Sequence, residues 1–432
     1  MNSTLSRRQF LQAAAAAGTG VATSSLVLPQ QLRAEPRSAN EKLNIGVIGV
    51  ANRGASNLAG VGDENIVVLC DIDQSNLAKG QVKHPKADTC DDFRRVFDRD
   101  DLDGVVISTP DHMHAIPLSM ALKRKLPVYC EKPLTHSVFE ARYIQELSAK
   151  AGVATQMGNQ IHSETNYRRV VEIIKAGIIG PVRRVHVWQG GGVRVGKRVK
   201  EGMAPKTVSY DQWIGPAPMR PYHESHFHFN WRYWWDFGGG QLADFGCHYM
   251  DLPFWALDLE YPTSVVGTGE KGHNGDNECP NRMRVDYEFP ARGDQPPVHL
   301  TWYHGGWRPK GAEVYQKGSA VLFEGPDGRL LADYGSRKLF MEAGKEARPV
   351  KQTIPNSIGH HAEWIAAIRT GSETGSRFSY AAVLTQAVLL GNVSYRVGQK
   401  KLNWDAKNLK ATNCPEADEF IRREYRKGWE LA

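Results

Sequence analysis

The feature that most constrains the fold is an apolar run that breaks at a glycine-rich turn. Residues 43–48 have the composition of a buried strand, and they lead into Gly49-Val50-Ala51-Asn52-Arg53-Gly54 and an expected helix to Val61. A second apolar run, 66–70, ends on Asp71, which lies 22 residues after Gly49. A strand, a glycine turn, a helix and a second strand that ends in an acid are typical of a dinucleotide-binding unit. The sequence therefore predicts a Rossmann domain.

The side chains of this unit indicate whether NAD or NADP is the expected cofactor. Ala51 places a methyl group where a glycine usually lets the backbone approach the pyrophosphate. The Asp71 carboxylate would accept hydrogen bonds from the adenosine ribose and repel a 2′-phosphate, and no Arg or Lys follows in residues 72–75. We therefore expect NAD in preference to NADP. The cofactor-binding residues expected here are Gly49, Ala51, Asn52, Arg53, Gly54 and Asp71.

Two later strands also end in polar residues. The run 102–108 leads into Thr109-Pro110 with His114 nearby, and the run 127–130 leads into Glu131-Lys132-Pro133. Residues just past the carboxyl ends of parallel strands face the ligand crevice. The further cofactor-binding residues expected here are therefore Thr109, Pro110, His114, Glu131 and Lys132. Ser137 and Glu140 then have the spacing of a capping box for the next helix. The Glu-Lys-Pro triplet is therefore expected at the mouth of the crevice, near the nicotinamide.

Taken together, the chain resembles the glucose–fructose oxidoreductase / inositol dehydrogenase / rhizopine-catabolism (Gfo/Idh/MocA) family, in particular its exported members. The resemblance covers about residues 42–400. It implies an α/β protein in which an N-terminal Rossmann domain is followed by an α+β domain with a large open, mainly antiparallel β-sheet. The matching pieces are 49–54, Asp71, Thr109, Pro110, His114, 131–133, 211–218, 231–251 and, within the last, Asp244 and His248.

The resemblance also implies roles for individual residues. Lys132 would lie beside nicotinamide and substrate, Gln160 near the nicotinamide, and Asp244 with His248 would form an acid/base pair. The residues themselves agree with this, because positions i and i+4 of a helix share one face. Oxidation of a secondary alcohol needs a base near neutral pKa, which His248 can supply, and Lys132 can stabilise the developing alkoxide.

A segment rich in histidine and aromatic residues precedes Asp244. His223, His226 and His228 lie within six residues, but no fourth ligand is evident, so we expect a polar active-site loop and no metal. Aromatic clusters are more often core than site, yet next to the acid/base pair they can stack on a sugar face. Trp231 and Arg232 are therefore the expected substrate-binding residues.

The N-terminus has the pattern of an export signal. Ser6-Arg7-Arg8-Gln9-Phe10-Leu11 is a twin-arginine motif, and a weakly apolar stretch follows from Ala13 to Leu28. The alternative is a frayed, alanine-rich helix. We expect a signal peptide at 1–34, a linker at 35–41, the Rossmann domain at 42–165 and a substrate-binding and oligomerisation domain at 166–432, in a periplasmic protein exported by the twin-arginine machinery.

Composition excludes several other classes. Of the formal charge of +7, three charges belong to arginines within residues 1–34, and the remainder is too dispersed to indicate a nucleic-acid partner. The longest apolar stretch is too short and too polar for stable insertion in a bilayer. The six cysteines form no CxxC pair, so buried thiols are expected, and a Cys279–Cys414 bridge is the one pairing considered.

Export bears on the predicted function, because no obvious soluble NAD pool outside the cytoplasm would recharge a dissociable cofactor. We expect an oxidoreductase that acts on a secondary hydroxyl of a sugar, polyol or glycoside with tightly bound, internally recycled NAD. One alternative is a redox-neutral, NAD-dependent glycosidase or lyase that passes through a transient keto-sugar. Another is a non-catalytic, NAD-binding sugar-binding protein. An open sheet face also predicts a homo-oligomer, either dimer or tetramer.

Overall fold

The structure, a computed structural model, describes residues 41–194, 196–197 and 201–431. The expected signal peptide at 1–34 and residues 35–40 of the linker lie outside the described residues. Among the helices of the described part, none is long and apolar enough to cross a membrane.

The N-terminal half contains a six-stranded parallel sheet with the order β3-β2-β1-β4-β5-β6. The order reverses between β1 and β4, and at such a switch point the carboxyl ends of the strands open into a ligand crevice. The predicted Rossmann fold is confirmed. The strands are β1 (Asn44–Ile48), β2 (Asn65–Cys70), β3 (Asp88–Cys90), β4 (Gly104–Ile107), β5 (Val128–Glu131) and β6 (Thr155–Gly158).

Helices cover this sheet where its sequence predicts them. In α5, the Ser137 side chain accepts from the Glu140 N–H while the Glu140 side chain accepts from the Ser137 N–H, so the predicted capping box is present. The α-helices are α2 (Arg53–Gly60), α3 (Gln74–Lys83), α4 (Ala115–Lys123) and α5 (Val138–Ala151), with short 3₁₀ turns η1 (Phe93–Asp98), η2 (Asp111–Met113) and η3 (Gln160–Ser163).

The C-terminal half is built on a nine-stranded sheet with the order β13-β12-β11-β7-β10-β9-β8-β14-β15. Its pairs are antiparallel except β10 with β7, which confirms the expected mainly antiparallel sheet. The strands are β7 (Arg184–Gln189), β8 (Ser264–Glu270), β9 (Arg282–Phe289), β10 (Val298–His304), β11 (Ala320–Gly325), β12 (Gly328–Ala332), β13 (Arg337–Met341), β14 (Leu402–Asp405) and β15 (Lys410–Ala411).

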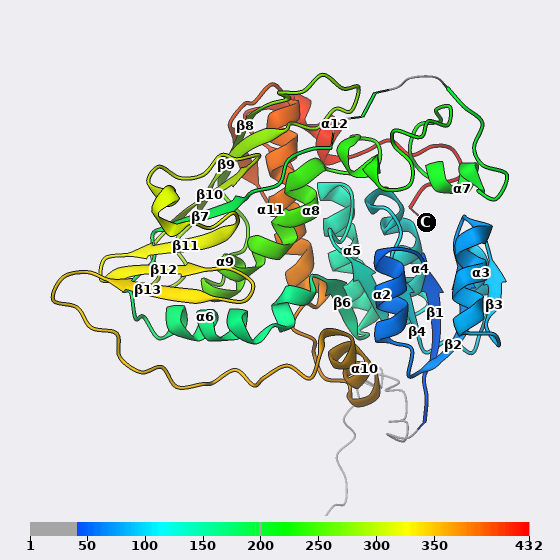
Figure 1. The fold of residues 1–432 in the computed structure, drawn as a ribbon, viewed down its shortest axis with the longest axis horizontal. Coiled ribbons are helices and arrows are strands. Elements are labelled where there is room, and N and C mark those ends of the chain that lie inside the picture. Colours follow the sequence, from blue (N-terminus) through cyan, green and yellow to red (C-terminus); the bar gives the residue numbers. More distant parts are fainter. Residues whose placement is uncertain (1–40, 195, 198–200, 432) are drawn as a thin grey trace, which may run out of the picture. The chain divides into compact units, whose positions relative to one another are not determined.

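Helix α11 (Phe378–Arg396) joins the two halves (Figure 1), because it packs against β8 and α8 on one side and against α5 and β6 on the other. Its residues 381–394 are all buried, which places it in the main hydrophobic core. The remaining helices are α6 (Thr165–Lys175), α7 (Tyr210–Ile214), α8 (Gly240–Tyr249), α9 (Asp251–Ala256), α10 (His360–Thr370) and α12 (Asp418–Ile421), with η4 (Asn230–Tyr233), η5 (Ala312–Tyr315) and η6 (Pro415–Ala417).

Helix α10 packs on the Rossmann half although it follows the nine-stranded sheet in the chain. Trp364 and Ile365 belong to the same hydrophobic cluster as strands β1 and β2. The boundary expected between residues 165 and 166 lies at the first residue of α6. The Rossmann core also includes α10, which comes about 200 residues later in the chain.

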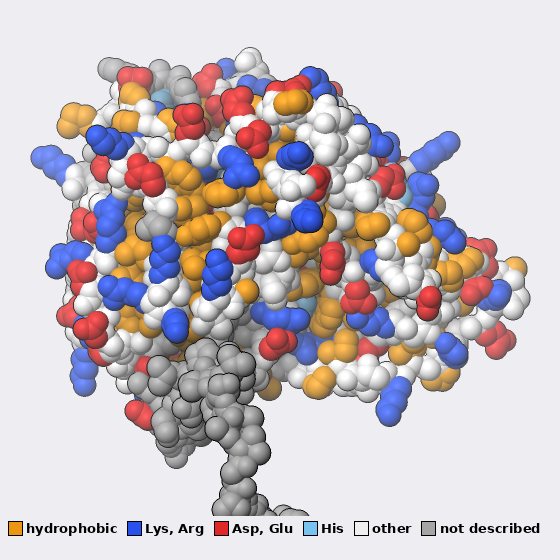
Figure 2. All heavy atoms as spheres, turned by 180° about the vertical axis from the view of Figure 1, so that it is seen from behind, with side chains coloured by type: hydrophobic (Ala, Val, Ile, Leu, Met, Phe, Trp, Pro, Cys, Tyr) orange, Lys and Arg blue, Asp and Glu red, His pale blue; other side chains and the backbone are white. Residues whose placement is uncertain are grey.

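The structure also shows how charged side chains and thiols are distributed. Figure 2 shows acidic and basic side chains interspersed over one face, with hydrophobic side chains between them and no continuous basic surface there. All six cysteines are free and buried, so the Cys279–Cys414 bridge is not formed.

Candidate active site

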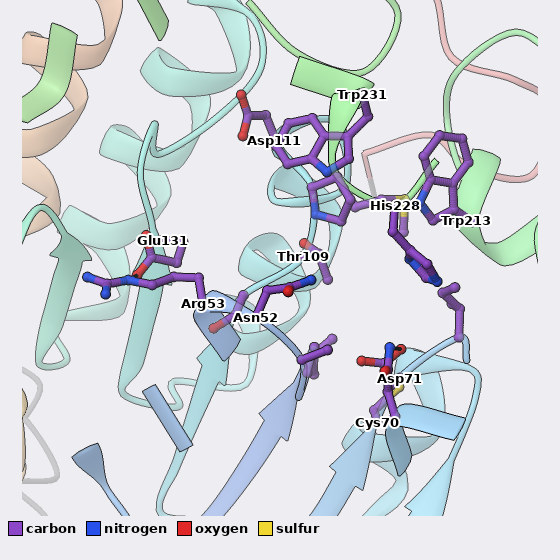
Figure 3. A pocket seen from close by; sticks show the side chains of 18 of the residues that line it. Asn52, Arg53, Cys70, Asp71, Thr109, Asp111, Glu131, Trp213, His228 and Trp231 are labelled. Carbon is purple, nitrogen blue, oxygen red and sulfur yellow. Dashed lines mark hydrogen bonds and ion pairs between the residues drawn. The ribbon is translucent and has the colours of Figure 1, made fainter. Parts of the chain in front are cut away.

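A cavity of about 350 Å³ follows the carboxyl edge of the parallel sheet. Figure 3 shows Asp71 and Cys70 at one end, Asp111 and Trp231 at the other, and Thr109 with Asn52 between them. Its walls come from the Rossmann strand ends, from the segment 202–237 of the second half and from α8. The predicted residues that line it are Gly49, Ala51, Asn52, Arg53, Asp71, Thr109, Pro110, Glu131, Lys132, Gln160, Trp231, Arg232 and His248.

At the first end, the Asp71 carboxylate is fixed by backbone N–H groups. Its Oδ2 accepts from the Val50 N–H at 3.0 Å and its Oδ1 from the Asp73 N–H at 3.0 Å. Burial raises the pKa of Asp71, although these hydrogen bonds act in the opposite direction. The carboxylate is therefore held at the end of β2, facing the cavity.

The glycine turn has the geometry that its sequence predicts. Gly49 has a φ of +83°, and its N–H donates to the Cys70 carbonyl. A Cβ on Gly54 would lie 2.1 Å from the Gly49 carbonyl oxygen, so only glycine lets α2 approach β1 this closely. Gly54 therefore acts through packing and does not line the cavity.

An ion pair lines the cavity beside this turn. Arg53 Nε donates to Glu131 Oε1 at 3.2 Å, and Asn57 Nδ2 donates to the same oxygen at 3.0 Å. Figure 3 shows the two side chains of the ion pair meeting. The first residue of α2 is thus tied to the end of β5.

Lys132 and Asp244 form the central contact of the site. Lys132 Nζ donates to the Asp244 carbonyl at 2.7 Å and to its Oδ1 at 2.5 Å, and Arg232 Nε donates to the same Oδ1 at 3.3 Å. Burial opposes ionisation, but Lys132 and Arg232 outweigh it and lower the pKa of Asp244 to about 2. Asp244 is therefore ionised at neutral pH and positions both cations.

His248 lies one turn after Asp244 on α8, as predicted, and lines the same cavity. Burial, reinforced by the charge of Lys132, lowers its pKa to about 3. Its Nδ1 is buried and has no hydrogen-bond partner within the described part of the chain. His248 is therefore a neutral imidazole at neutral pH.

His114 does not line the cavity, although the sequence places it among the cofactor-binding residues. Its Nδ1 lies 2.8 Å from the Pro133 carbonyl and its Nε2 lies 2.9 Å from the Thr109 carbonyl. It therefore ties the loop after β4 to the loop after β5 from behind. Thr109 Oγ1 and Gln160 Oε1 are buried without a partner among the described residues, and both residues line the cavity.

The second end of the cavity combines aromatic and charged groups. The Arg232 guanidinium lies over the rings of Trp231 and Phe229, at 4.2 and 4.7 Å from their centroids. Asp111 lines this end with only 5% of its surface exposed, and burial raises its pKa to about 7. The sequence motifs gave Asp111 no role, because its burial comes from residues distant in sequence.

The segment 202–237 covers the Asp71 end of the cavity, which the sequence did not predict. The Ser209 N–H donates to the Ile72 carbonyl at 2.8 Å, and Ser209 Oγ donates to Asp91 Oδ2 at 2.5 Å. His228 Nε2 lies 3.0 Å from Asp73 Oδ2. Gln212, Trp213 and His228 of this segment face Asp71 across the cavity.

The other histidines of this segment have structural contacts. His226 stacks on Trp213 with ring centroids 5.4 Å apart, and His223 Nδ1 accepts from the Ser225 N–H. In the part of the chain that the structure describes, no group of three or more His, Cys, Asp or Glu residues is placed to hold a metal ion.

Two family models match nearly all of the described chain. Residues 43–159 match the oxidoreductase family, NAD-binding Rossmann fold, and residues 163–431 match the oxidoreductase family, C-terminal alpha/beta domain. Fold and site together define a two-domain protein whose N-terminal half has the fold of a dinucleotide-binding domain. The chain belongs to the Gfo/Idh/MocA oxidoreductase family.

Individual relatives match over shorter stretches. An inositol 2-dehydrogenase of Rubrobacter xylanophilus is 30% identical over 149 residues, 33% of this chain and 43% of that relative. A glycosyl hydrolase family 109 protein of Saccharopolyspora erythraea is 30% identical over 233 residues, 48% of this chain and 49% of that relative. The chain thus spans about half or less of the length of these curated relatives.

Among solved structures, the aldose-aldose oxidoreductase from Caulobacter crescentus, complexed with glycerol, has the same fold. The two structures align with a TM-score of 0.61 over 84% of this chain and 100% of that chain, at 15% identity.

Proposed function

We propose that this chain is an exported oxidoreductase that acts on a secondary hydroxyl of a sugar, polyol or glycoside and transfers a hydride between NAD and the carbon that bears this hydroxyl. In this proposal the cofactor stays bound between the oxidation and the reduction, so that each turnover regenerates it. The observation that carries the proposal is the cavity that joins Asp71 to Lys132 and His248. Asp244 does not line it but accepts a hydrogen bond from Lys132, and the segment 202–237 covers the Asp71 end.

The residues present fit a dinucleotide on three counts. Because Gly54 has no side chain, the N-terminus of α2 lies close to the turn after β1, where a pyrophosphate would bind. Asp71 offers a carboxylate where a ribose would lie. The unpartnered Thr109 Oγ1 and Gln160 Oε1 offer buried polar atoms farther along the cavity. No Arg or Lys faces Asp71 among the described lining residues of that end, which favours NAD over NADP.

The covering segment supports a retained cofactor. It pairs with the Rossmann half through the Asp73–His228 contact, through the Ser209–Asp91 hydrogen bond and through the Gln74 N–H, which donates to the Thr207 carbonyl. Release of a bound dinucleotide would require these contacts to open. Because several hydrogen bonds must break before the segment 202–237 can open, we expect the dinucleotide to dissociate slowly.

The chemistry assigned to the chain's own residues follows from their geometry. A bound nicotinamide would supply the hydride acceptor. Lys132 keeps one N–H after its two bonds to Asp244, and it can donate this N–H to the substrate oxygen and stabilise negative charge there. Trp231 offers an aromatic face and Arg232 a donor for the rest of a sugar.

The proposal is tested on the full chain as purified. We expect nucleotide that survives extensive buffer exchange, identified as NAD(H) by absorbance and mass, and turnover of sugar pairs without added NAD. Lys132→Ala should lower kcat/KM by about 10²–10³-fold, because a preorganised donor to the reacting oxygen is lost. Absence of bound nucleotide together with strict dependence on added NAD would contradict a retained cofactor.

A second candidate is a redox-neutral glycosidase or lyase, favoured by the similarity to the glycosyl hydrolase family 109 protein. Transient oxidation at a ring carbon would acidify the neighbouring C–H and allow elimination of a glycosidic substituent before re-reduction. Release of an aglycone from a panel of nitrophenyl glycosides, with no net change in NADH, would distinguish this activity from transfer between two sugars.

Export and homo-oligomer formation belong to the same proposal. The twin-arginine sequence at residues 6–11 supports export, and the large open sheet supports a dimer or tetramer. Fractionation of cells that express the native chain or an Arg7→Lys, Arg8→Lys variant tests the first point. Light scattering after gel filtration tests the second.

A further inference from the structure

The segment 422–431 follows α12 and runs back across the molecule to α7, as its red trace shows in Figure 1. None of its described residues belongs to a helix or strand. Even so, Trp429 is only 6% exposed, and Arg423, Tyr425 and Arg426 are half-buried. A segment without regular structure that buries large side chains is fixed by specific contacts, and these contacts show which elements it joins.

The first part of the segment is anchored to the Rossmann half. Arg423 Nη1 donates to the His112 carbonyl at 3.4 Å and lies 3.0 Å from His136 Nδ1. Tyr425 Oη donates to Glu140 Oε1 at 2.7 Å, and the Glu140 side chain is fully buried. His112 follows β4 and His136 follows β5. This part of the segment is therefore fixed to the loops that follow two strands of the crevice.

Arg426 attaches the segment to α7, within the sequence motif 211–218. Its Nε donates to the Gly215 carbonyl at 2.8 Å, its Nη2 to the Asp211 carbonyl at 3.0 Å, and its backbone N–H to the Pro216 carbonyl at 3.1 Å. Its Nη1 also donates to Asp211 Oδ1. A guanidinium that donates in several fixed directions defines the position of its partner more narrowly than a point charge does. Arg426 therefore holds α7 and the turn that follows it.

Trp429 attaches the same segment to η1 of the Rossmann half. Its ring centroid lies 6.2 Å from that of Phe93, and the Arg94 guanidinium lies 4.4 Å from its centroid. The Arg426 guanidinium lies 5.3 Å from the same ring. Phe93 and Arg94 are the first two residues of η1. Trp429 therefore contacts both η1 and the arginine that holds α7.

Both attached elements form part of the cavity wall. Phe93 of η1 lines the cavity, and so do Gln212 and Trp213 of α7, together with Asp71. The wall around the expected adenosine half of the cofactor thus includes two elements that the segment 422–431 joins from outside. None of the described residues of this segment lines the cavity itself. The segment can therefore act on a bound dinucleotide only through the elements that it holds.

We propose that Arg426 and Trp429 are positioning residues for the dinucleotide, because they hold α7 against η1 and keep the adenosine end of the cavity closed over bound NAD(H). This inference rests on the proposed function, in which the cofactor is retained. For α7 to move away from η1, the hydrogen bonds of Arg426 and the packing of Trp429 must break, in addition to the contacts of the segment 202–237 with the Rossmann half. The segment 422–431 thus limits the rate at which nucleotide escapes.

The test measures the release of NADH from the full chain. Nucleotide-loaded protein is mixed with an excess of a second, NADH-consuming dehydrogenase and its substrate, so that released NADH is oxidised before it can rebind. We expect Arg426→Ala and Trp429→Ala to release NADH about 10–100-fold faster than wild type, because loss of contacts that hold a complex acts mainly on its dissociation rate. In steady-state turnover, both variants should raise the KM for NAD more than they change kcat, since neither residue lines the cavity.

Two matched variants separate positioning from stability. Lys427→Ala removes a positive charge from an exposed position of the same segment and should leave the release rate unchanged. Trp404→Ala truncates a tryptophan that is 7% exposed in β14, which does not line the cavity. It should lower the Tm as Trp429→Ala does and leave the release rate unchanged.

The outcomes separate the inference from the function beneath it. If wild type retains nucleotide while Arg426→Ala and Trp429→Ala both release it at the wild-type rate, the role of the segment 422–431 alone is overturned. Equally fast release from Trp404→Ala and Trp429→Ala also overturns that role, because lost stability would then account for the effect. A wild-type chain that binds no NAD(H), or that releases it on mixing, contradicts the proposed retained cofactor and this inference with it.

Discussion

At the scale of single residues, two carboxylates near the end of the cavity opposite Asp71 are in opposite electrostatic situations. Asp111 lines the cavity, and Asp244 is hydrogen-bonded to Lys132. Lys132 and Arg232 both donate to Asp244 and, against burial, lower its pKa to about 2. Asp111 receives only their more distant charge, so burial dominates and raises its pKa to about 7. Environments that separate the pKa values of two acids are typical of sites that assign them different tasks. Asp244 is therefore ionised at neutral pH, whereas Asp111 takes up a proton at about pH 7.

This difference predicts a pH-dependent cost to stability. Because the folded chain binds the Asp111 proton more tightly than the unfolded chain does, stability decreases as pH rises from about 4 to about 7 and stays low above that. Asp111→Asn removes this cost, so the Tm of the variant should exceed that of wild type at pH 8 and approach it at pH 5. Differential scanning fluorimetry from pH 5 to 8 measures the effect, and equal pH slopes in both proteins would contradict it.

At the scale of elements, helix α2 packs closely against the glycine turn that follows β1. The Arg53–Glu131 ion pair and the Asn57–Glu131 hydrogen bond tie α2 to β5, so α2 bridges two strand ends of the crevice. Its close packing on the Gly49 carbonyl is possible only because position 54 has no side chain.

Gly54→Ala should therefore displace α2. The added Cβ would lie 2.1 Å from the Gly49 carbonyl oxygen, and overpacking of this kind costs about 1–3 kcal/mol or more. We expect a lower free energy of unfolding in urea and less copurified nucleotide. Gly335→Ala is the matched control, since nothing lies within 4 Å of a Cβ there. Equal stability of the two variants would show that α2 can adjust at no cost.

At the scale of the whole molecule, the two halves share their cores. Trp364 of α10 is fully buried among strands of the Rossmann sheet, and α11 lies between the second sheet and α5. A Cβ on Gly104 would lie 3.0 Å from the Trp364 ring, so β4 carries a glycine where the indole packs. The Rossmann half therefore depends on a helix that follows the second sheet in the chain.

Trp364→Ala should lower the free energy of unfolding by about 3–5 kcal/mol, the usual cost of truncating a buried tryptophan. Ile358→Ala is the control, because Ile358 is 67% exposed and should change stability little. The isolated segment 42–165 should lack a cooperative thermal transition by circular dichroism. A stable, cooperative fragment would contradict the shared core.

Prediction from the sequence worked where a local pattern is sufficient. The glycine turn, the Ser137–Glu140 capping box and the shared helix of Asp244 and His248 all follow from spacing within a few residues. It was incomplete where contacts join distant segments. His114 matches a motif next to the site, yet its ring nitrogens contact two backbone carbonyls behind the cavity.

By itself, the sequence determined the Rossmann unit and the residue types of the site, because strand and helix periodicity and turn chemistry are local properties. Only the tertiary structure decided that Lys132 and Arg232 meet Asp244, that 202–237 covers the Asp71 end, and that Asp111 is buried in the cavity wall. Burial and electrostatic coupling depend on which distant segments pack together, and local spacing does not specify that packing.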